Sequence, residues 1–174
     1  KNGELVWEQR AGSGGTMGGI HYGMSTDGDK LFVGVSDLPT NNPYNYGPAH
    51  PGIHALDVQT GEVLWRNDLP NKCTESQFLC WQGISAAVSS TPELVFAGGL
   101  DGILRAFDST DGSILWETNT RRTFGIRNGI EARGGSIEAD GPVIVNGQLF
   151  ITTGYEKWGE APGNTLLVYS IGGE

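Results

Sequence analysis

Short apolar runs recur along the chain at similar spacings. An eleven-residue pattern, Ala-x-Asp-x-x-Thr/Asp-Gly-x-Val/Ile-Leu-Trp, occurs at residues 55–65 and again at 106–116, and its tail, Gly-Glu-Leu-Val-Trp, ends at Trp7. The Gly before the second apolar run can adopt the positive φ that a tight hairpin requires. Each full copy therefore predicts two strands joined by a hairpin turn. The repeated positions include Ala55, Asp57, Gly61 and Trp65 in the first copy, and Ala106, Asp108, Gly112 and Trp116 in the second.

Two more strands are predicted upstream of each hairpin, the first rich in small residues and the second in β-branched and aromatic residues. Small residues suit an inner strand, where neighbouring backbones approach closely. Four short strands in a unit of about 50 residues, without helical periodicity, are typical of a β-propeller blade. The expected first strands are 18–23, 82–87 and 134–139, and the expected second strands are 30–34, 94–98 and 148–152.

The predicted fold is all-β, a β-propeller of four-stranded antiparallel blades. The repeats account for about three blades, whereas propellers close with roughly four to eight. We therefore expect residues 1–174 to be the C-terminal portion of one propeller domain, within a ring of seven or eight blades. The expected blade units are 17–65, 81–116 and 133–171, with residues 1–7 as the outer strand of a preceding blade.

Composition narrows the function classes. The 174 residues carry a net charge of −9, which disfavours binding to nucleic acid or to an anionic membrane surface. No apolar run approaches the roughly 18 residues of a membrane span. Cys73 and Cys80 lie in a polar loop at a spacing that suits neither a CxxC redox motif nor a zinc half-site. They are either free thiols or, as we favour, a disulfide formed in an oxidising compartment.

The predicted turns and loops differ in length on the two sides of the blades. Turns between first and second strands and between third and fourth strands are short, whereas the other connections are long. Because loops alternate between the two faces of an up-and-down sheet, the long connections should gather on one face, and long loops commonly carry function. The long connections are 8–17, 38–51, 66–81, 117–133 and 156–163.

The repeat resembles the tryptophan-docking motif of pyrroloquinoline quinone (PQQ) dependent dehydrogenases, in which the Trp packs against the neighbouring blade. Nearly the whole chain resembles the C-terminal part of polyvinyl-alcohol dehydrogenase-like quinoproteins. The stretches that carry this narrower resemblance are Gly18 to Gly23, the Cys73/Cys80 loop, Phe96 to Gly102, Ala132 to Glu138 and Pro162 to Leu167.

The resemblance implies a periplasmic or secreted enzyme that oxidises alcohols, such as secondary alcohols or polyvinyl alcohol. It also implies PQQ on the propeller axis and electron transfer to a cytochrome c or a similar acceptor. Better-studied members hold Ca²⁺ and use a carboxylate base, but no motif places those metal ligands in this chain.

Four residues near the expected first strands are candidates for the site. Arg133 could pair a PQQ carboxylate, with Ser136 as a further donor, or it could be a surface cation that neutralises a nearby Glu. Glu138 could be the catalytic base, a cation ligand or a structural channel carboxylate. His21 could act as a donor or base, or be a buried His with its hydrogen bonds satisfied.

Three further candidates lie in or directly beside the insertion at 156–163. Trp158 and Tyr155 could cover a flat quinone or a substrate by stacking, or simply pin the loop. Asn164 could contact the cofactor or cap a turn. Two other functions remain open: a propeller scaffold without catalytic activity, and a polymer- or carbohydrate-binding module that uses the loop-rich face, including Tyr44 and Tyr46.

Overall fold

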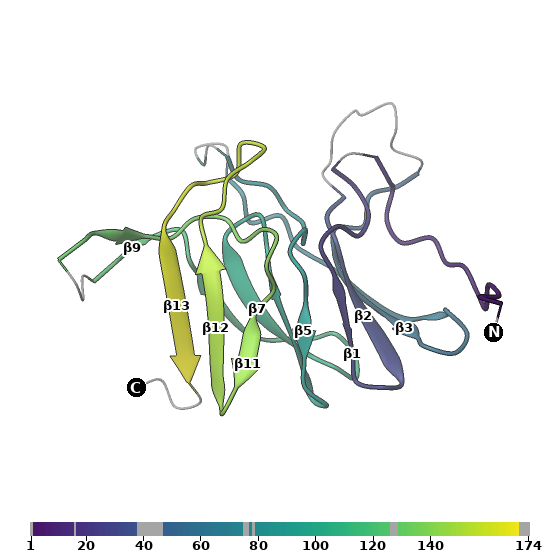
Figure 1. The fold of residues 1–174 in the computed structure, drawn as a ribbon. Helices are drawn as coiled ribbons and strands as arrows, with labels where there is room; N and C mark the ends of the chain where they lie inside the picture. The colour runs from purple at the N-terminus through teal and green to yellow at the C-terminus, as the bar shows by residue number, and fades with distance from the viewer. Residues whose placement is uncertain are drawn as a thin grey trace.

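Three consecutive antiparallel sheets stand side by side in the computed structural model (Figure 1). The structure describes residues 2–15, 17–37, 47–74, 77, 79–125 and 129–170, and within them it contains strands and no helix. None of the described segments could span a membrane as a helix. The predicted all-β architecture of successive propeller blades is confirmed.

The strands follow one another in chain order within each sheet. The first sheet comprises β1 (Met24–Thr26), β2 (Lys30–Val35), β3 (Gly52–Asp57) and β4 (Val63–Asp68). The second comprises β5 (Ser89–Ser90), β6 (Leu94–Gly98), β7 (Ile103–Asp108) and β8 (Ile114–Asn119). The third comprises β11 (Val143–Val145), β12 (Gln148–Thr153) and β13 (Thr165–Ser170). A two-stranded ribbon, β9 (Thr123–Phe124) and β10 (Ala132–Arg133), was not expected from the sequence.

The repeated Asp and Gly residues shape equivalent hairpins. Asp57 Oδ1 accepts hydrogen bonds from the backbone N–H groups of Gln59 and Thr60, both at 2.8 Å. Asp108 Oδ1 accepts one from Thr110 N–H at 2.7 Å. The turns place Gly61 at φ 75° and Gly112 at φ 74°, a region that side chains rarely allow. The repeat therefore encodes the turn conformation itself.

The repeated Trp residues dock on the hairpin of the next sheet. Trp65, on β4, donates a hydrogen bond from Nε1 to the carbonyl oxygen of Ser109 at 3.2 Å. Its ring lies where a Cβ on Gly112 would stand, so the turn glycine also makes room for the indole. Trp7 repeats both contacts one unit earlier, with Val58 O at 2.9 Å and with Gly61. This is the neighbouring-blade packing that the resemblance implied.

We expect Trp65→Ala to lower the unfolding free energy by about 3 kcal/mol, because it leaves a cavity between the first two sheets. Trp158→Ala, at an indole that is 58% exposed, is the matched control and should change stability little. Urea unfolding of the full-length protein measures both. Equal effects of the two variants would contradict the docking role of Trp65.

One detail of the predicted blades is corrected. The stretches expected as first strands are extended segments outside the sheets, and the innermost strands β1, β5 and β11 begin after them. They make single hydrogen bonds to neighbouring blades, such as Ile84 N–H to Val35 O at 3.0 Å, instead of a continuous ladder. Residues 2–10 are not assigned as a strand and pair with no strand of the described residues, so the expected outer strand of a preceding blade at 1–7 stays a prediction.

The hydrophobic core lies between adjacent sheets. The first two sheets bury Phe32, Ile53, Val95 and Phe107, and the second and third bury Leu104, Ile137 and Ile151. Within the described residues the turns between β1 and β2 and between β11 and β12 point down in Figure 1, whereas the connections before β5 and between β12 and β13 lie at the top. The loop-rich face expected from the alternation of turns is therefore present.

Candidate functional site

The segments that precede the innermost strands occupy equivalent places in the three units. Each is held by a hydrogen bond from the end of the second strand or the turn after it: Ser36 N–H to Gly19 O, Leu100 N–H to Gly83 O, and Gly154 N–H to Ser136 O, at 2.8 to 3.0 Å. Two residues further along each segment stand His21, Ser85 and Glu138. These three side chains therefore occupy one repeat position in three successive blades.

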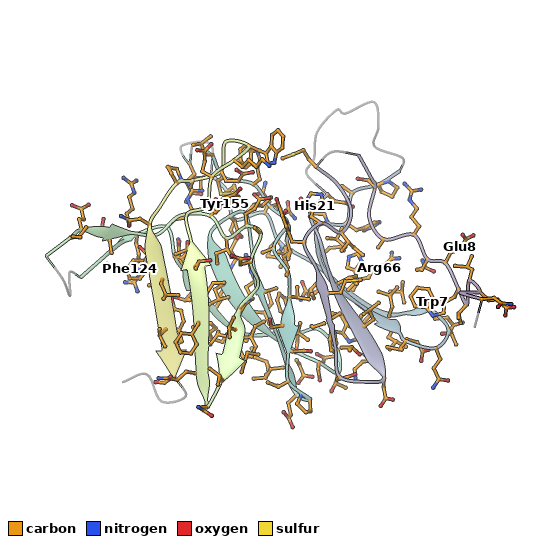
Figure 2. All side chains as sticks on the ribbon, in the orientation of Figure 1. Trp7, Glu8, His21, Arg66, Phe124 and Tyr155 are labelled. Carbon is orange, nitrogen blue, oxygen red and sulfur yellow. A yellow bond between two sulfur atoms is a disulfide. The ribbon has the colours of Figure 1, made fainter. Side chains whose placement is uncertain are left out.

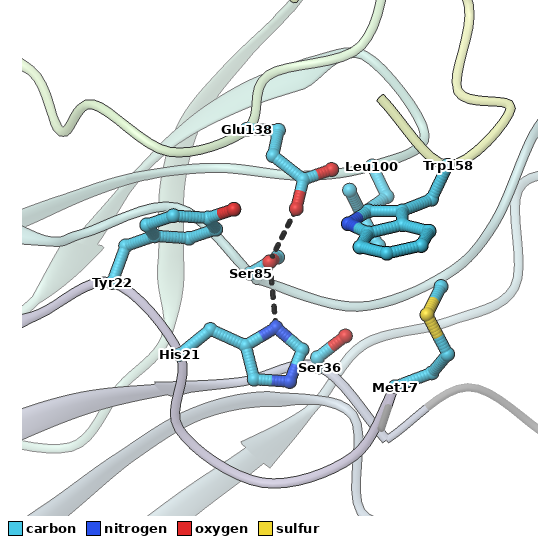
Figure 3. A pocket seen from close by; sticks show the side chains of 8 residues that line it. All are labelled: Met17, His21, Tyr22, Ser36, Ser85, Leu100, Glu138 and Trp158. Carbon is cyan, nitrogen blue, oxygen red and sulfur yellow. Dashed lines mark hydrogen bonds between the residues drawn. The ribbon is translucent and has the colours of Figure 1, made fainter. Parts of the chain in front are cut away.

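The three equivalent side chains form a hydrogen-bonded chain (Figure 3). His21 Nδ1 lies 2.8 Å from Ser85 Oγ, and Ser85 Oγ lies 2.9 Å from Glu138 Oε1. His21 Nε2 lies 3.2 Å from the carbonyl oxygen of Gly18. Glu138 is 6% exposed, whereas His21 is exposed on the loop-rich face (Figure 2). The chain thus connects a buried carboxyl group to the surface.

The hydrogen-bonded chain borders a cavity of about 200 Å³ on the loop-rich face. Its walls combine an apolar side, from Met17, Leu100 and the Trp158 indole, with a polar side from the chain and from Tyr22. The full lining is Met17, His21, Tyr22, Ser36, Ser85, Leu100, Glu138 and Trp158.

Glu160 is a second buried carboxyl beside Glu138. It is 0% exposed, and its Oε2 accepts hydrogen bonds from the backbone N–H groups of Lys157 at 3.1 Å and Trp158 at 2.8 Å. Oε2 of Glu138 and Oε1 of Glu160 are also buried, and neither receives a hydrogen bond from a donor group of the described residues. A proton held between the two carboxyl groups satisfies both oxygens, which two carboxylates could not do.

The two carboxyl groups have different proton affinities. Burial, together with the hydrogen bond to Glu160, raises the pKa of Glu138 to about 7, although Ser85 and Lys157 oppose the shift. Burial acts in the same direction on Glu160, but its hydrogen bonds, with the N–H group of Trp158 first and with Glu138 and the N–H group of Lys157 after it, together outweigh burial and hold the pKa of Glu160 below its usual range. Near neutral pH the shared proton therefore belongs to Glu138, and Glu160 supplies the negative charge.

Two predicted site residues, Ser136 and Asn164, hold neighbouring segments together by hydrogen bonds and do not line the cavity. Ser136 is fully buried; its Oγ donates to Leu100 O at 2.7 Å and accepts from Ala161 N–H at 3.1 Å. Asn164 accepts from Arg133 N–H through Oδ1 at 2.9 Å. Ser136 thereby ties the Glu160 loop to the β6–β7 turn, and Asn164 ties β10 to the start of β13.

Three other predicted residues differ in their relation to the cavity. Trp158 lines it, and Lys157 Nζ lies 5.4 Å from the centre of its ring. Tyr155 is exposed on the same face but is not part of the lining (Figure 2). Arg133 is exposed on the β9–β10 ribbon, which projects away from the sheets, and it does not line the cavity.

The favoured disulfide is present: Cys73 and Cys80 are bonded, with their Cα atoms 5.6 Å apart. Their loop runs beside the insertion that carries Trp158, since Leu79 and Trp81 lie close to Gly159. Tyr44 and Tyr46, named for the polymer-binding alternative, lie outside the described residues.

Ser85 and Glu160 were missed by reasoning from the sequence. Aligning the three first segments on Ile20, Ile84 and Ile137 would have placed Ser85 in register with His21 and Glu138. Glu160 carries no comparable signal, because its loop is an insertion in one blade only.

The sequence and the fold of the chain are similar to those of known proteins. A family profile described as outer membrane protein assembly factor BamB, of the PQQ repeat type, matches residues 1–117. The chain is 33% identical to a polyvinylalcohol dehydrogenase of Pseudomonas sp and 34% identical to one of Sphingopyxis sp. (strain 113P3), over 99% of its own length in each case. The chain belongs to the PQQ-type β-propeller family.

These matches cover nearly all of this chain but only a small part of each relative. The chain spans 28% of the length of each of the two polyvinylalcohol dehydrogenases. Among solved structures, the quinohemoprotein alcohol dehydrogenase of Comamonas testosteroni is 21% identical with a TM-score of 0.57, over 87% of this chain and 19% of that one. That structural likeness supports the family's propeller fold for the chain and nothing finer.

Proposed function

We propose that this chain is part of a quinoprotein dehydrogenase that oxidises alcohols, such as secondary alcohols or polyvinyl alcohol. The observation that carries the proposal is Glu138, a carboxyl group with a pKa raised to about 7 at the wall of a cavity on the loop-rich face. Such a group can accept a proton from a substrate hydroxyl and release it again near neutral pH. The similarity to two polyvinylalcohol dehydrogenases supports an alcohol as substrate.

The cavity fits one part of the proposed cofactor, PQQ, a flat ring system with three carboxylates. Trp158, Leu100 and Met17 offer apolar surface for a ring. The described lining includes no Arg or Lys, and its buried charge is negative, so it does not fit the carboxylates. Lys157, whose Nζ lies 5.4 Å from the centre of the Trp158 ring, is one candidate counter-charge, and the others would have to come from residues outside the described lining.

The chain's own contribution is to handle the substrate proton. Ionised Glu138 accepts it, Ser85 holds Oε1 of that carboxyl in place, and the apolar wall keeps water from competing. PQQ, if held beside Trp158, Leu100 and Met17, would supply the two-electron acceptor for the alcohol, and a cytochrome c or similar acceptor belongs to the same proposal. The described residues contain no group of three or more His, Cys, Asp or Glu side chains suited to a metal ion, so we assign no Ca²⁺ ligands here.

A periplasmic or secreted location belongs to the same proposal. The Cys73–Cys80 disulfide supports it, because disulfides persist in oxidising compartments.

The full-length protein, supplied with PQQ and Ca²⁺, should reduce a dye acceptor in the presence of an alcohol. The measurements are the absorbance of bound quinone and the rate of dye reduction, with the alcohol omitted as control. A protein that binds no quinone and reduces no dye would refute the proposal.

A second candidate is a propeller scaffold that binds other proteins. The observation in its favour is the family profile over residues 1–117, which is described as an assembly factor. A scaffold has no need for a buried carboxyl pair, so replacing Glu138 should leave its protein binding unchanged. A polymer- or carbohydrate-binding module would instead bind polymer without quinone or turnover.

A further inference from the structure

The insertion at 156–163 brings a second carboxyl group against Glu138. Glu160 is 0% exposed, and its Oε2 accepts hydrogen bonds from the backbone N–H groups of Lys157 and Trp158. The same loop conformation places the Trp158 indole at the cavity wall (Figure 3). The insertion therefore fixes a negative charge inside the protein at the place where it also lines the cavity.

The two carboxyl oxygens of Glu138 have neighbours with opposite effects. Ser85 Oγ donates to Oε1 at 2.9 Å, a hydrogen bond that favours the ionised group. Oε2 is buried beside Oε1 of Glu160, and neither oxygen receives a hydrogen bond from a donor group of the described residues. Oε2 can be satisfied there by carrying the proton itself and donating it to Glu160, which favours the protonated group. The proton affinity of Glu138 is thus a balance between Ser85 and Glu160.

We propose that Glu160 is a positioning residue that makes Glu138 a stronger base toward the substrate hydroxyl, a role that rests on the proposed function. Ionised Glu138 lies beside the fixed charge of Glu160, and accepting a proton relieves this repulsion. The O–H bond of the substrate breaks, its electron pair stays on the substrate oxygen, and an O–H bond forms on Glu138. The new hydrogen is shared with Glu160, which takes up no proton itself because its two N–H donors keep it ionised.

Three other groups near Glu138 do not replace Glu160 in this role. Lys157 acts to lower the pKa of Glu138. Tyr22 stays a neutral phenol at the cavity wall, because burial, followed by the carboxylates of Glu138 and Glu160, raises its pKa. His21 is one hydrogen bond further away, with its Nδ1 2.8 Å from the serine hydroxyl. Without the charge of Glu160, the shift of the Glu138 pKa would rest on burial alone.

The first test is the pH dependence of alcohol oxidation in the full-length protein. In Glu160→Gln the amide oxygen can still accept from the loop N–H groups, whereas the amide NH₂ donates to Oε2 of ionised Glu138. The pH midpoint of kcat/KM should therefore fall by about one unit. In Ser85→Ala, which removes the opposing hydrogen bond, the midpoint should instead rise by about half a unit.

Glu156→Gln is the matched control in the same loop. Glu156 is exposed, lies outside the cavity lining, and accepts a hydrogen bond from Gly159 N–H at 3.1 Å that an amide oxygen can keep. Its midpoint should equal that of the wild type. An unchanged midpoint in Glu160→Gln, or a shift in the same direction in Glu160→Gln and Ser85→Ala, would overturn the proposal.

The second test does not depend on catalysis. The pKa of Glu138 is about 7 in the folded protein against an ordinary 4.5, so the stability that its proton provides is lost as the pH rises through 7. From pH 5 to pH 8 the unfolding constant of the full-length wild type should rise about tenfold more than that of Glu160→Gln, as measured by urea unfolding. Equal rises would refute the role of Glu160. A protein that shows the difference but oxidises no alcohol would retain the coupled carboxyl pair and refute the proposed function instead.

Discussion

Glu138→Gln is expected to lower alcohol-dependent turnover at least about 100-fold in the full-length protein. The amide keeps the shape of the side chain and can still bond Ser85 Oγ, but it cannot accept a proton from the substrate. Steady-state dye reduction at saturating PQQ measures the loss. Glu131→Gln changes the same charge at an exposed position outside the cavity lining and is the matched control.

The pH dependence of turnover follows from the same group. Because the base acts in its ionised form, and its pKa is raised to about 7, turnover should be low at acidic pH and rise through neutrality to a plateau. An unshifted Glu would reach its plateau more than two pH units lower, since its ordinary pKa is 4.5. Wild-type turnover in Glu138→Gln, or a plateau already reached at pH 5 in the wild type, would contradict Glu138 as the base.

Asp101→Ala is expected to lower the unfolding free energy by about 3–5 kcal/mol, because it would leave a buried guanidinium without its counter-charge. Arg105, on β7, is 0% exposed and donates through Nη1 and Nη2 to both carboxylate oxygens of Asp101, at 3.2 and 2.5 Å. Asp101, 4% exposed, also accepts from Ile103 N–H at 3.0 Å. Only Glu117 otherwise approaches this guanidinium among the ion pairs of the described residues, with its Oε2 3.9 Å from Nε.

Urea unfolding of the full-length protein measures this loss, and exposed Asp140→Ala provides the matched control, expected within about 0.5 kcal/mol of wild type. The double variant Asp101→Leu, Arg105→Met should recover most of the stability, because apolar groups of similar size need no partner. If Asp101→Ala is as stable as Asp140→Ala, the ion pair between Asp101 and Arg105 does not stabilise the fold as argued here.

Features within one blade could be predicted from the sequence, whereas the site, which depends on how blades pack against one another, could be predicted only in part. Within a blade, hairpins and strands depend on residues that are close in sequence, such as Asp57 with Thr60 or the positive φ of Gly61. These interactions recur at fixed offsets, so the repeat predicts them well. Even Trp65, whose partner Gly112 lies in the next blade, is predictable because the docking contact repeats with the period of the chain.

The site depends on how blades face one another. Glu138 and His21 were both predicted as candidates, yet only the packing of three blades places Ser85 between them. The same packing leaves Arg133 on an exposed ribbon and turns Ser136 toward the backbone of Leu100. A local pattern carries no information about these directions.

The sequence by itself therefore determined the repeating sheets, their hairpins, the docking tryptophans and the face on which long loops gather, because each of these follows from short-range spacing or from the period. Only the tertiary structure decided that a carboxyl pair is buried at the cavity wall and that one hydroxyl links it to an exposed imidazole. Proton affinity depends on burial and on donors brought from distant parts of the chain, and these exist only once the blades have packed.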